Sequence, residues 1–201
     1  MKLGTIAYSA VAVAALTSQA FAQNKTNPGP GITLLEYSGR ALAVADLCAP
    51  GVSMRATKYA ERKATPQAWG SRADVNATIA ANADFFDFPG WSLVIGRARG
   101  AGEDWPADKQ NLEKRWYWNF GPRAGGVVKA ETPIAQGMTE VVGAHYVIYE
   151  NGKKLPYPTD DPTIIGAHRR TAYAIDKSHE HFLVFVSDVS ITCGTVVDRL
   201  L

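Results

Sequence analysis

The sequence has little net charge and few long apolar runs. Lys and Arg together exceed Asp and Glu by only two, and no basic run is interleaved with aromatic residues. Proteins bind a nucleic-acid backbone through a strongly positive surface, and this chain has no such excess of positive charge. We therefore expect no nucleic-acid partner. After the first 22 residues, charged residues or Pro interrupt every apolar run well before the ~20 residues that a spanning helix needs, so we expect no membrane span.

Cysteine is also scarce, with Cys48 and Cys193 as the only two in the chain. An oxidising compartment would allow them to pair, and the alternative is two buried free thiols.

Residue spacings typical of metal sites are missing as well. The segment His179-Glu180-His181 falls on an expected hairpin turn and lacks the spacing of a known motif. We therefore expect no metal and no cofactor.

The N-terminus has the three parts of a secretory signal. Lys2 supplies the positive start, residues 6–16 form an apolar stretch, and Ala20-Phe21-Ala22 is a small-residue cleavage site. The alternative is a membrane anchor, but polar residues interrupt the stretch and it is too short to span a bilayer. We therefore expect a signal peptide over 1–22, cleaved after Ala22, and a secreted or periplasmic protein.

The rest of the chain is long enough for one domain but short of two. Residues 23–31, with Asn, Pro and Gly, are expected to form a flexible lead, and 32–201 the domain. Residue patterns predict strands over 32–38, 41–47, 52–57, 74–81, 146–150, 172–175 and 181–186, and the alternation is strictest over 52–57. We expect a turn at Asn151-Gly152 after the strand 146–150, and a hairpin formed by the last two strands. The expected class is α+β: a strand-rich single domain with a mixed or antiparallel sheet and a few helices.

Helix signals are few. Thr65 followed by Pro66 predicts a short helix that ends near Trp69. Thr192 is the expected cap of a C-terminal helix, and because the sequence stops inside the apolar pattern of this helix, we expect the chain to be cut short. Between 100 and 126, abundant Gly and Trp with little period predict a long ordered loop.

One segment gathers amide, carboxylate and aromatic groups at the expected exit of a strand. It contains Asn82, Asp84, Phe86 and Trp91. An aromatic ring can pack against the apolar face of a sugar while amide and carboxylate groups bond its hydroxyls, so this segment is a candidate carbohydrate site. The alternative is that the rings belong to the core and the polar residues only form a turn.

A basic segment precedes the strand expected at 172–175. His168, Arg169, Arg170 and Thr171 lie there in sequence. One of the arginines could hold a phosphate or carboxylate through its fork of donors. The alternative is that these residues are solvated surface groups.

Taken in order, these segments resemble the phosphodiester glycosidase family, bacterial relatives of the lysosomal uncovering enzyme. AANADFF is similar to the family's Asn-containing turn at Asn82 and Phe86. AHRRTAYAI is similar to a His-Pro-Arg-Thr segment of the family, with Arg169 at the proline. Asp188 in LVFVSDVS stands at the family's acidic position, without the Gly-Arg that normally follows. The resemblance covers about residues 32–201.

The resemblance implies a hydrolase that cleaves a sugar from a sugar 1-phosphodiester. Asn82 would bond the sugar, Arg170 would neutralise the leaving phosphate, and Asp188 or Asp84 would act as nucleophile or base. We therefore expect Asn82, Arg170 and Asp188 to converge in one cleft. The residues expected to bind substrate around them are Phe86, Trp91, His168 and Thr171.

Further expectations follow from the resemblance. The family places the elements that carry Cys48 and Cys193 in one domain, so we predict a disulfide between them. The family's domain continues past the C-terminal helix into a strand with an Asp-Gly-Gly-Gly segment. This segment is absent here, so we expect the domain to lack its last strand or strands and the chain as given to have weak or no activity. The alternative function is a non-catalytic secreted glycan-binding or cell-envelope protein.

Overall fold

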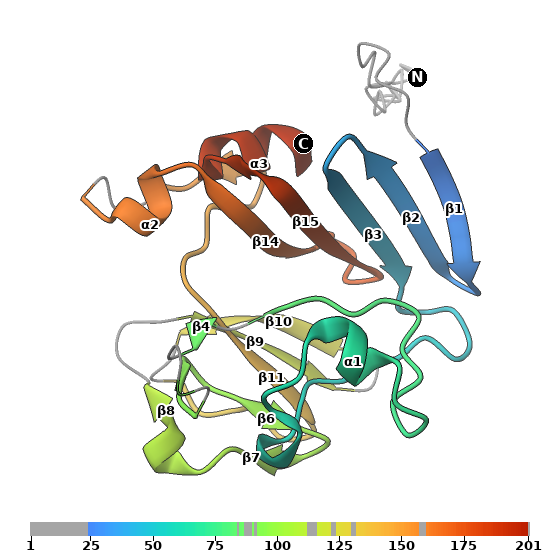
Figure 1. The fold of residues 1–201 in the computed structure, drawn as a ribbon, viewed down its shortest axis with the longest axis vertical. Helices are drawn as coiled ribbons and strands as arrows, with labels where there is room; N and C mark the ends of the chain where they lie inside the picture. The colour runs from blue at the N-terminus through green and yellow to red at the C-terminus, as the bar shows by residue number, and fades with distance from the viewer. Residues whose placement is uncertain are drawn as a thin grey trace, which may run out of the picture.

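A computed structural model describes residues 24–83, 85–86, 90, 92–111, 116–121, 124–129, 132–156 and 160–200. These residues form two layers of mainly antiparallel sheet, one above the other in Figure 1. The predicted α+β class is confirmed. No helix in the described ranges is long and apolar enough to cross a membrane.

The upper layer, which we call the terminal sheet, joins the two ends of the chain. Its strand order is β1-β2-β3-β15-β14, and every neighbouring pair is antiparallel. The bounds are β1 (Asn24–Gly29), β2 (Ile32–Tyr37), β3 (Arg40–Asp46), β14 (His168–Ile175) and β15 (His181–Ile191).

β1 lies where we expected an irregular lead. Asn24 stands opposite Glu36, and Gly29 stands opposite Ile32, so this polar segment is the edge strand of the sheet. The backbone pairing with β2 makes this segment a strand, which its composition alone does not predict.

The lower layer, which we call the central sheet, has the order β10-β9-β11-β6-β7. Its strands are β6 (Arg99–Gly100), β7 (Glu103–Asp104), β9 (Trp116–Gly121), β10 (Ala124–Lys129) and β11 (Glu140–Ala144). Four of these strands lie in the region for which we predicted a long loop, so that prediction is wrong. Backbone pairing of β9 with both β10 and β11 gives the segment its order despite its glycines.

Short strands complete the two layers. β4 (Phe85–Phe86) pairs antiparallel with β5 (Val94–Ile95), which pairs parallel with β8 (Gln110–Asn111). β12 (Tyr149–Glu150) and β13 (Lys153–Lys154) form a hairpin at the predicted Asn-Gly turn. Both turn residues have positive φ, as this kind of hairpin turn requires.

The helices are short, and two of them begin where the sequence predicts. α1 (Pro66–Gly70) is capped by Thr65, whose hydroxyl accepts the amide of Ala68 at 3.1 Å. α3 (Cys193–Leu200) is capped in the same way by Thr192. The others are α2 (Pro162–Ile165) and the 3₁₀ turns η1 (Tyr59–Glu61) and η2 (Ala107–Lys109).

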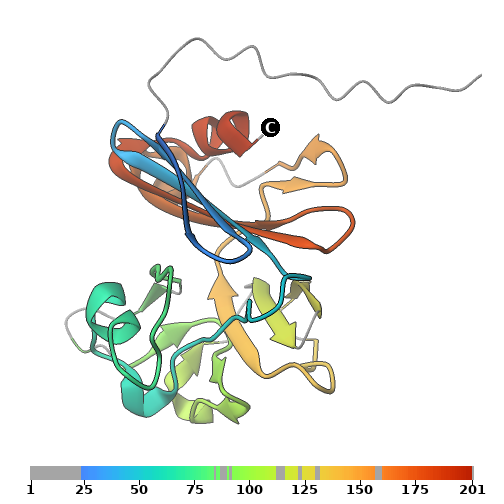
Figure 2. The same cartoon turned by 90° about the vertical axis from the view of Figure 1, so that its right-hand side faces the viewer.

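The two faces of the terminal sheet have different partners, because successive side chains of a strand point to opposite faces. Phe185 packs with Val196 of α3 on the outer face. Phe182 packs with Met54 and with Val142 of the central sheet on the inner face. In Figure 2, α3 and the central sheet lie on opposite sides of the terminal sheet. Each buried Phe contributes roughly 1.5–3 kcal/mol.

Two predicted strands are absent from the described structure. Residues 52–57 are extended but form no ladder, because the amide of Ala56 donates to the Glu140 side chain instead. Residues 74–81 form turns and bends, with the amides of Val75 and Asn76 both donating to the carbonyl of Arg72.

The predicted disulfide is wrong: Cys48 is an exposed free thiol and Cys193 a buried one. Cys48 follows the end of β3 that pairs with His181, whereas Cys193 follows the opposite end of β15. Eleven residues of β15 at about 3.3 Å each separate these ends by roughly 30 Å. A disulfide needs Cα atoms within about 7 Å.

Candidate functional site

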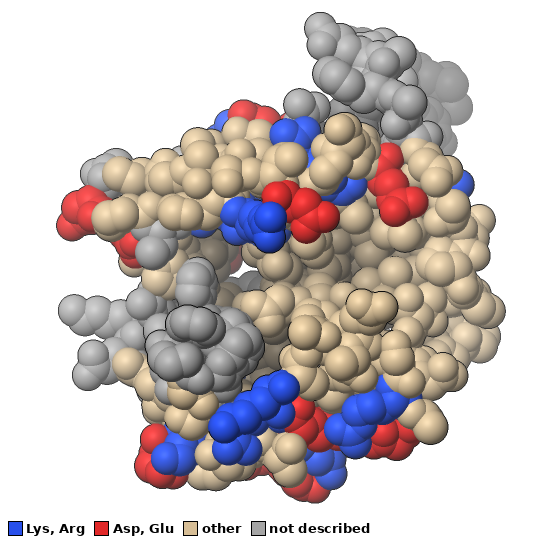
Figure 3. All heavy atoms as spheres, in the orientation of Figure 1, with Lys and Arg blue, Asp and Glu red and all other residues tan. Residues whose placement is uncertain are grey.

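A pocket of about 700 Å³ lies between the inner face of the terminal sheet and the segment 50–83. The surface is hollowed between the two layers (Figure 3). The wall of the pocket that the terminal sheet forms is mostly apolar and includes Ala43, Phe182 and Tyr173. Val141 of the central sheet also lines the pocket. The opposite wall carries charged and aromatic groups. Such a mixture of an apolar wall and a few polar groups is typical of small-molecule pockets.

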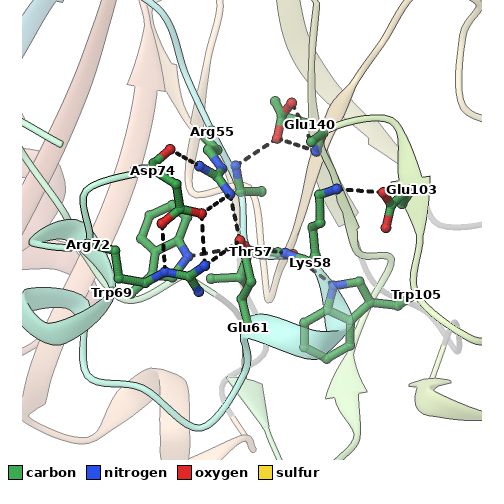
Figure 4. A network of polar contacts seen from close by, with 12 residues as sticks. Arg55, Thr57, Lys58, Glu61, Trp69, Arg72, Asp74, Glu103, Trp105 and Glu140 are labelled. Carbon is green, nitrogen blue, oxygen red and sulfur yellow. Dashed lines mark hydrogen bonds and ion pairs between the residues drawn. The ribbon is translucent and has the colours of Figure 1, made fainter. Parts of the chain in front are cut away.

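Glu61 is the centre of the polar wall (Figure 4). Its carboxylate accepts the amide of Lys58 at 2.9 Å and the indole N–H of Trp69 at 3.1 Å, and it pairs with Arg55 at 2.5 Å. Burial by itself raises the pKa of this carboxyl, but these bonds and the charge of Arg55 outweigh it and lower the pKa overall. Glu61 is therefore ionised at neutral pH and unsuited to be a general acid.

Arg55 links this wall to the turn after α1. Its guanidinium donates to the carbonyl of Asp74 at 2.7 Å and lies 5.7 Å from the centre of the Trp69 ring. Asp74 in turn accepts two bonds from Arg72, at 2.8 and 2.9 Å, and these lower the pKa of its carboxyl. These contacts join Glu61, Arg55, Arg72 and Asp74 in one connected network along this wall of the pocket.

Glu140 is a buried carboxylate that also lines the pocket, with 8% of its surface exposed. It accepts the amides of Ala56 at 2.8 Å and Ala101 at 3.0 Å. The nearby Lys58 pairs with Glu103 instead (Figure 4). Among the described residues, the carboxylate of Glu140 is therefore bonded to backbone amides and not to a cation.

Asn82, the first residue singled out from the sequence, lines the same pocket. Its side chain is exposed, and its carbonyl accepts the hydroxyl of Tyr173 at 2.5 Å. This bond ties the strap of residues 78–83 to the inner face of the terminal sheet. Asp84 and Trp91 lie outside the described residues, and Phe86 is described only as part of β4.

Arg170 lies on the outer face of the terminal sheet, because it shares a face with Ala172, which packs against the Phe185 cluster. Its guanidinium donates to the carbonyls of Gly166 at 2.6 Å, Ile164 at 3.2 Å and Ile191 at 3.2 Å. Arg170 thus joins the end of α2 to the end of β15, on the opposite face of the sheet from Asn82.

The remaining predicted residues lie away from the pocket as well. Asp188 is exposed, and its amide donates to Gly39 at 2.9 Å. His168 is exposed beside the carbonyl of Pro162, and Thr171 is exposed on β14. The structure therefore does not bring Asn82, Arg170 and Asp188 into one cleft.

A second cluster of titratable groups lies near the ends of α2 and α3. The Nε2 atom of His145 is 3.0 Å from the Asp161 carboxylate. Burial raises the pKa of the nearby Cys193 thiol, which makes it a poor nucleophile. No group of three or more His, Cys, Asp or Glu within the described ranges is arranged to hold a metal ion.

Sequence reasoning missed most of the pocket's polar residues. Glu140 is 84 residues from the amide of Ala56 that it binds, so no local pattern connects them. A local contact among them is the bond from the amide of Lys58 to the carboxylate of Glu61, three residues later at η1. In comparisons with known proteins, no family model and no curated protein matches this chain. The family resemblance of the sequence motifs stays a prediction.

Proposed function

We propose that this protein binds a sugar 1-phosphodiester in the pocket beneath the terminal sheet and hydrolyses it. The observation that carries the proposal is the position of Asn82. This residue, singled out as the sugar contact by its sequence motif, lines a pocket of about 700 Å³, within the few hundred to a thousand Å³ of small-molecule sites. The rings of Trp69 and Tyr173 line the same pocket and suit the apolar face of a sugar.

The chemistry requires a carboxylate that can attack the sugar or activate water. A phosphodiester is already a good leaving group, so help from a general acid matters less. Glu61 and Asp74 are each neutralised by arginines. Glu140 has no cation partner among the described residues, and we assign it the role of nucleophile or base.

The assay measures release of free sugar from a sugar 1-phosphodiester. Glu140→Gln keeps the size of the side chain but removes its charge, so turnover should fall by about a hundredfold or more. The matched control is Glu103→Gln, which removes an exposed carboxylate outside the pocket and should leave turnover within about twofold. Equal loss in both variants would refute the role given to Glu140.

A second function, glycan binding without turnover, is favoured by one observation. The carboxylates of the pocket also hold the fold together: Glu61 through four partners, and Glu140 through two separate backbone segments. The two functions differ in one measurement. Saturable binding of the phosphodiester with no sugar released over hours would select the binding function.

Ligand binding can be followed by intrinsic tryptophan fluorescence, since Trp69 and Trp105 both line the pocket. Tyr173→Phe removes the hydroxyl that fixes the carbonyl of Asn82 but keeps the ring. We expect it to weaken sugar binding by about five- to tenfold. Failure of wild-type protein to bind any sugar or sugar phosphodiester would refute the proposed function altogether.

A further inference from the structure

Arg62 is an arginine of the pocket wall that the network around Glu61 does not use. It directly follows η1, and its guanidinium carbon lies 3.8 Å from the centre of the Tyr59 ring, flat enough on that face for a cation–π contact. Tyr59 meets Trp105 edge to face, with ring centres 5.3 Å apart and an angle of 74°. Trp105 is itself buried.

This stack is anchored at both ends. The indole N–H of Trp105 donates to the carbonyl of Thr57 at 2.9 Å (Figure 4). The Nη1 group of Arg62 donates to the carbonyl of Tyr59 at 2.9 Å. The guanidinium is therefore held in one place before any ligand binds, which lowers the entropy cost of a contact with that ligand.

The donors of Arg62 are mostly unused. Its Nε is buried without a hydrogen-bond partner, and the bond from Nη1 is the only hydrogen bond or ion pair of this guanidinium in the described part of the chain. By contrast, Arg55 on the same wall is paired with Glu61 and bonded to Asp74. Arg170, the expected phosphate contact, is occupied by three carbonyls.

The charge near Arg62 is also unbalanced. A guanidinium carries a permanent positive charge and matches the oxygens of a phosphate with its fork of donors. The next residue, Lys63, is exposed and also lines the pocket. An anion bound at this end of the pocket would be attracted to both positive charges.

We propose that Arg62 is the residue that contacts the phosphate of the ligand, with its free guanidinium donors on the phosphate oxygens. This inference rests on the proposed function, because it assigns one end of the same pocket to the anionic part of the substrate. The sugar then lies toward Asn82 and Tyr173, at the strap.

The test compares two ligands of the same sugar, one with the phosphate group and one without it: a sugar 1-(methyl phosphate) and the methyl glycoside. Binding of each is measured by calorimetry at low salt for wild-type protein, Arg62→Gln and Arg62→Lys. The control is Arg169→Gln, which removes an exposed arginine outside the pocket. Thermal melts of all variants exclude unfolding as the cause of a change.

We expect Arg62→Gln to weaken the phosphodiester by about tenfold or more and the neutral glycoside by less than about twofold. Arg62→Lys should retain part of the phosphodiester affinity, because it keeps the charge but loses the planar fork. Arg169→Gln should change neither. Added salt should weaken only the phosphodiester in wild-type protein.

Two results would overturn the inference while the proposed function stands. One is an unchanged phosphodiester affinity in Arg62→Gln, and the other is an equal loss for both ligands, which would mean that Arg62 only shapes the pocket. If wild-type protein binds neither ligand, the proposed function fails and this inference fails with it.

Discussion

Replacing Arg170 by Met separates a structural role of this residue from a role in ligand binding. The change keeps the aliphatic stem but removes the guanidinium that donates to the carbonyls of Ile164, Gly166 and Ile191. A typical hydrogen bond contributes about 1 kcal/mol net, and two of these three bonds are long, at 3.2 Å. We therefore expect the free energy of unfolding to fall by about 2–3 kcal/mol.

Thermal unfolding followed by circular dichroism measures this loss, which for a chain of this size lowers the melting temperature by roughly 5–10 °C. The control is Arg169→Met, which removes one bond from an exposed neighbour to the carbonyl of Asp188 and should cost less than about 1 kcal/mol. Affinity for the sugar phosphodiester should be unchanged in both variants. An Arg170→Met variant of wild-type stability that no longer binds the phosphodiester would refute the reasoning.

Three further predictions concern single contacts. A thiol reagent should label Cys48 at once but Cys193 only after unfolding, and the mass of the non-reduced protein should show no disulfide. A Cys48 that the reagent does not label in the folded protein would contradict its exposed position. Thr65→Ala should cost about 1 kcal/mol through loss of the α1 cap, and an unchanged denaturant midpoint would contradict this. The hydrogen bond that the His181 ring donates to the Asp176 carboxylate raises the pKa of His181, so the stability that this bond contributes is present below about pH 6.5 and is lost as pH rises through the higher folded value. His181→Gln should flatten that slope, which at an exposed pair amounts to less than about 1 kcal/mol, and an equally steep slope in the variant would count against the pair.

Local signals in the sequence predict local structure well. The caps at Thr65 and Thr192 and the Asn-Gly turn at 151–152 each depend on bonds within a few residues, and each is found where expected. The hairpin of β14 and β15 also forms as predicted, and both strands are longer than the apolar ranges 172–175 and 181–186 from which they were predicted. Such contacts need no knowledge of the rest of the fold.

Contacts between distant segments decide the rest. The alternating residues 52–57 form no ladder because Glu140, far along the chain, takes the amide of Ala56. Residue type alone cannot tell whether the donors of Arg170 reach a ligand or three backbone carbonyls. Nor does it show that Arg62 stacks on a tyrosine with most of its donors unused. The sequence therefore predicted Asn82 as part of the candidate site, but not the charged residues of the pocket.

A crystal structure of the protein with a bound, non-hydrolysable sugar 1-phosphodiester tests the central claim most directly. We predict that the sugar lies between Asn82 and Tyr173 in the pocket beneath the terminal sheet, with its phosphate at Arg62. Arg170 should remain bonded to its three carbonyls. A ligand bound beside Arg170 on the outer face, with the pocket free of it, would contradict the account.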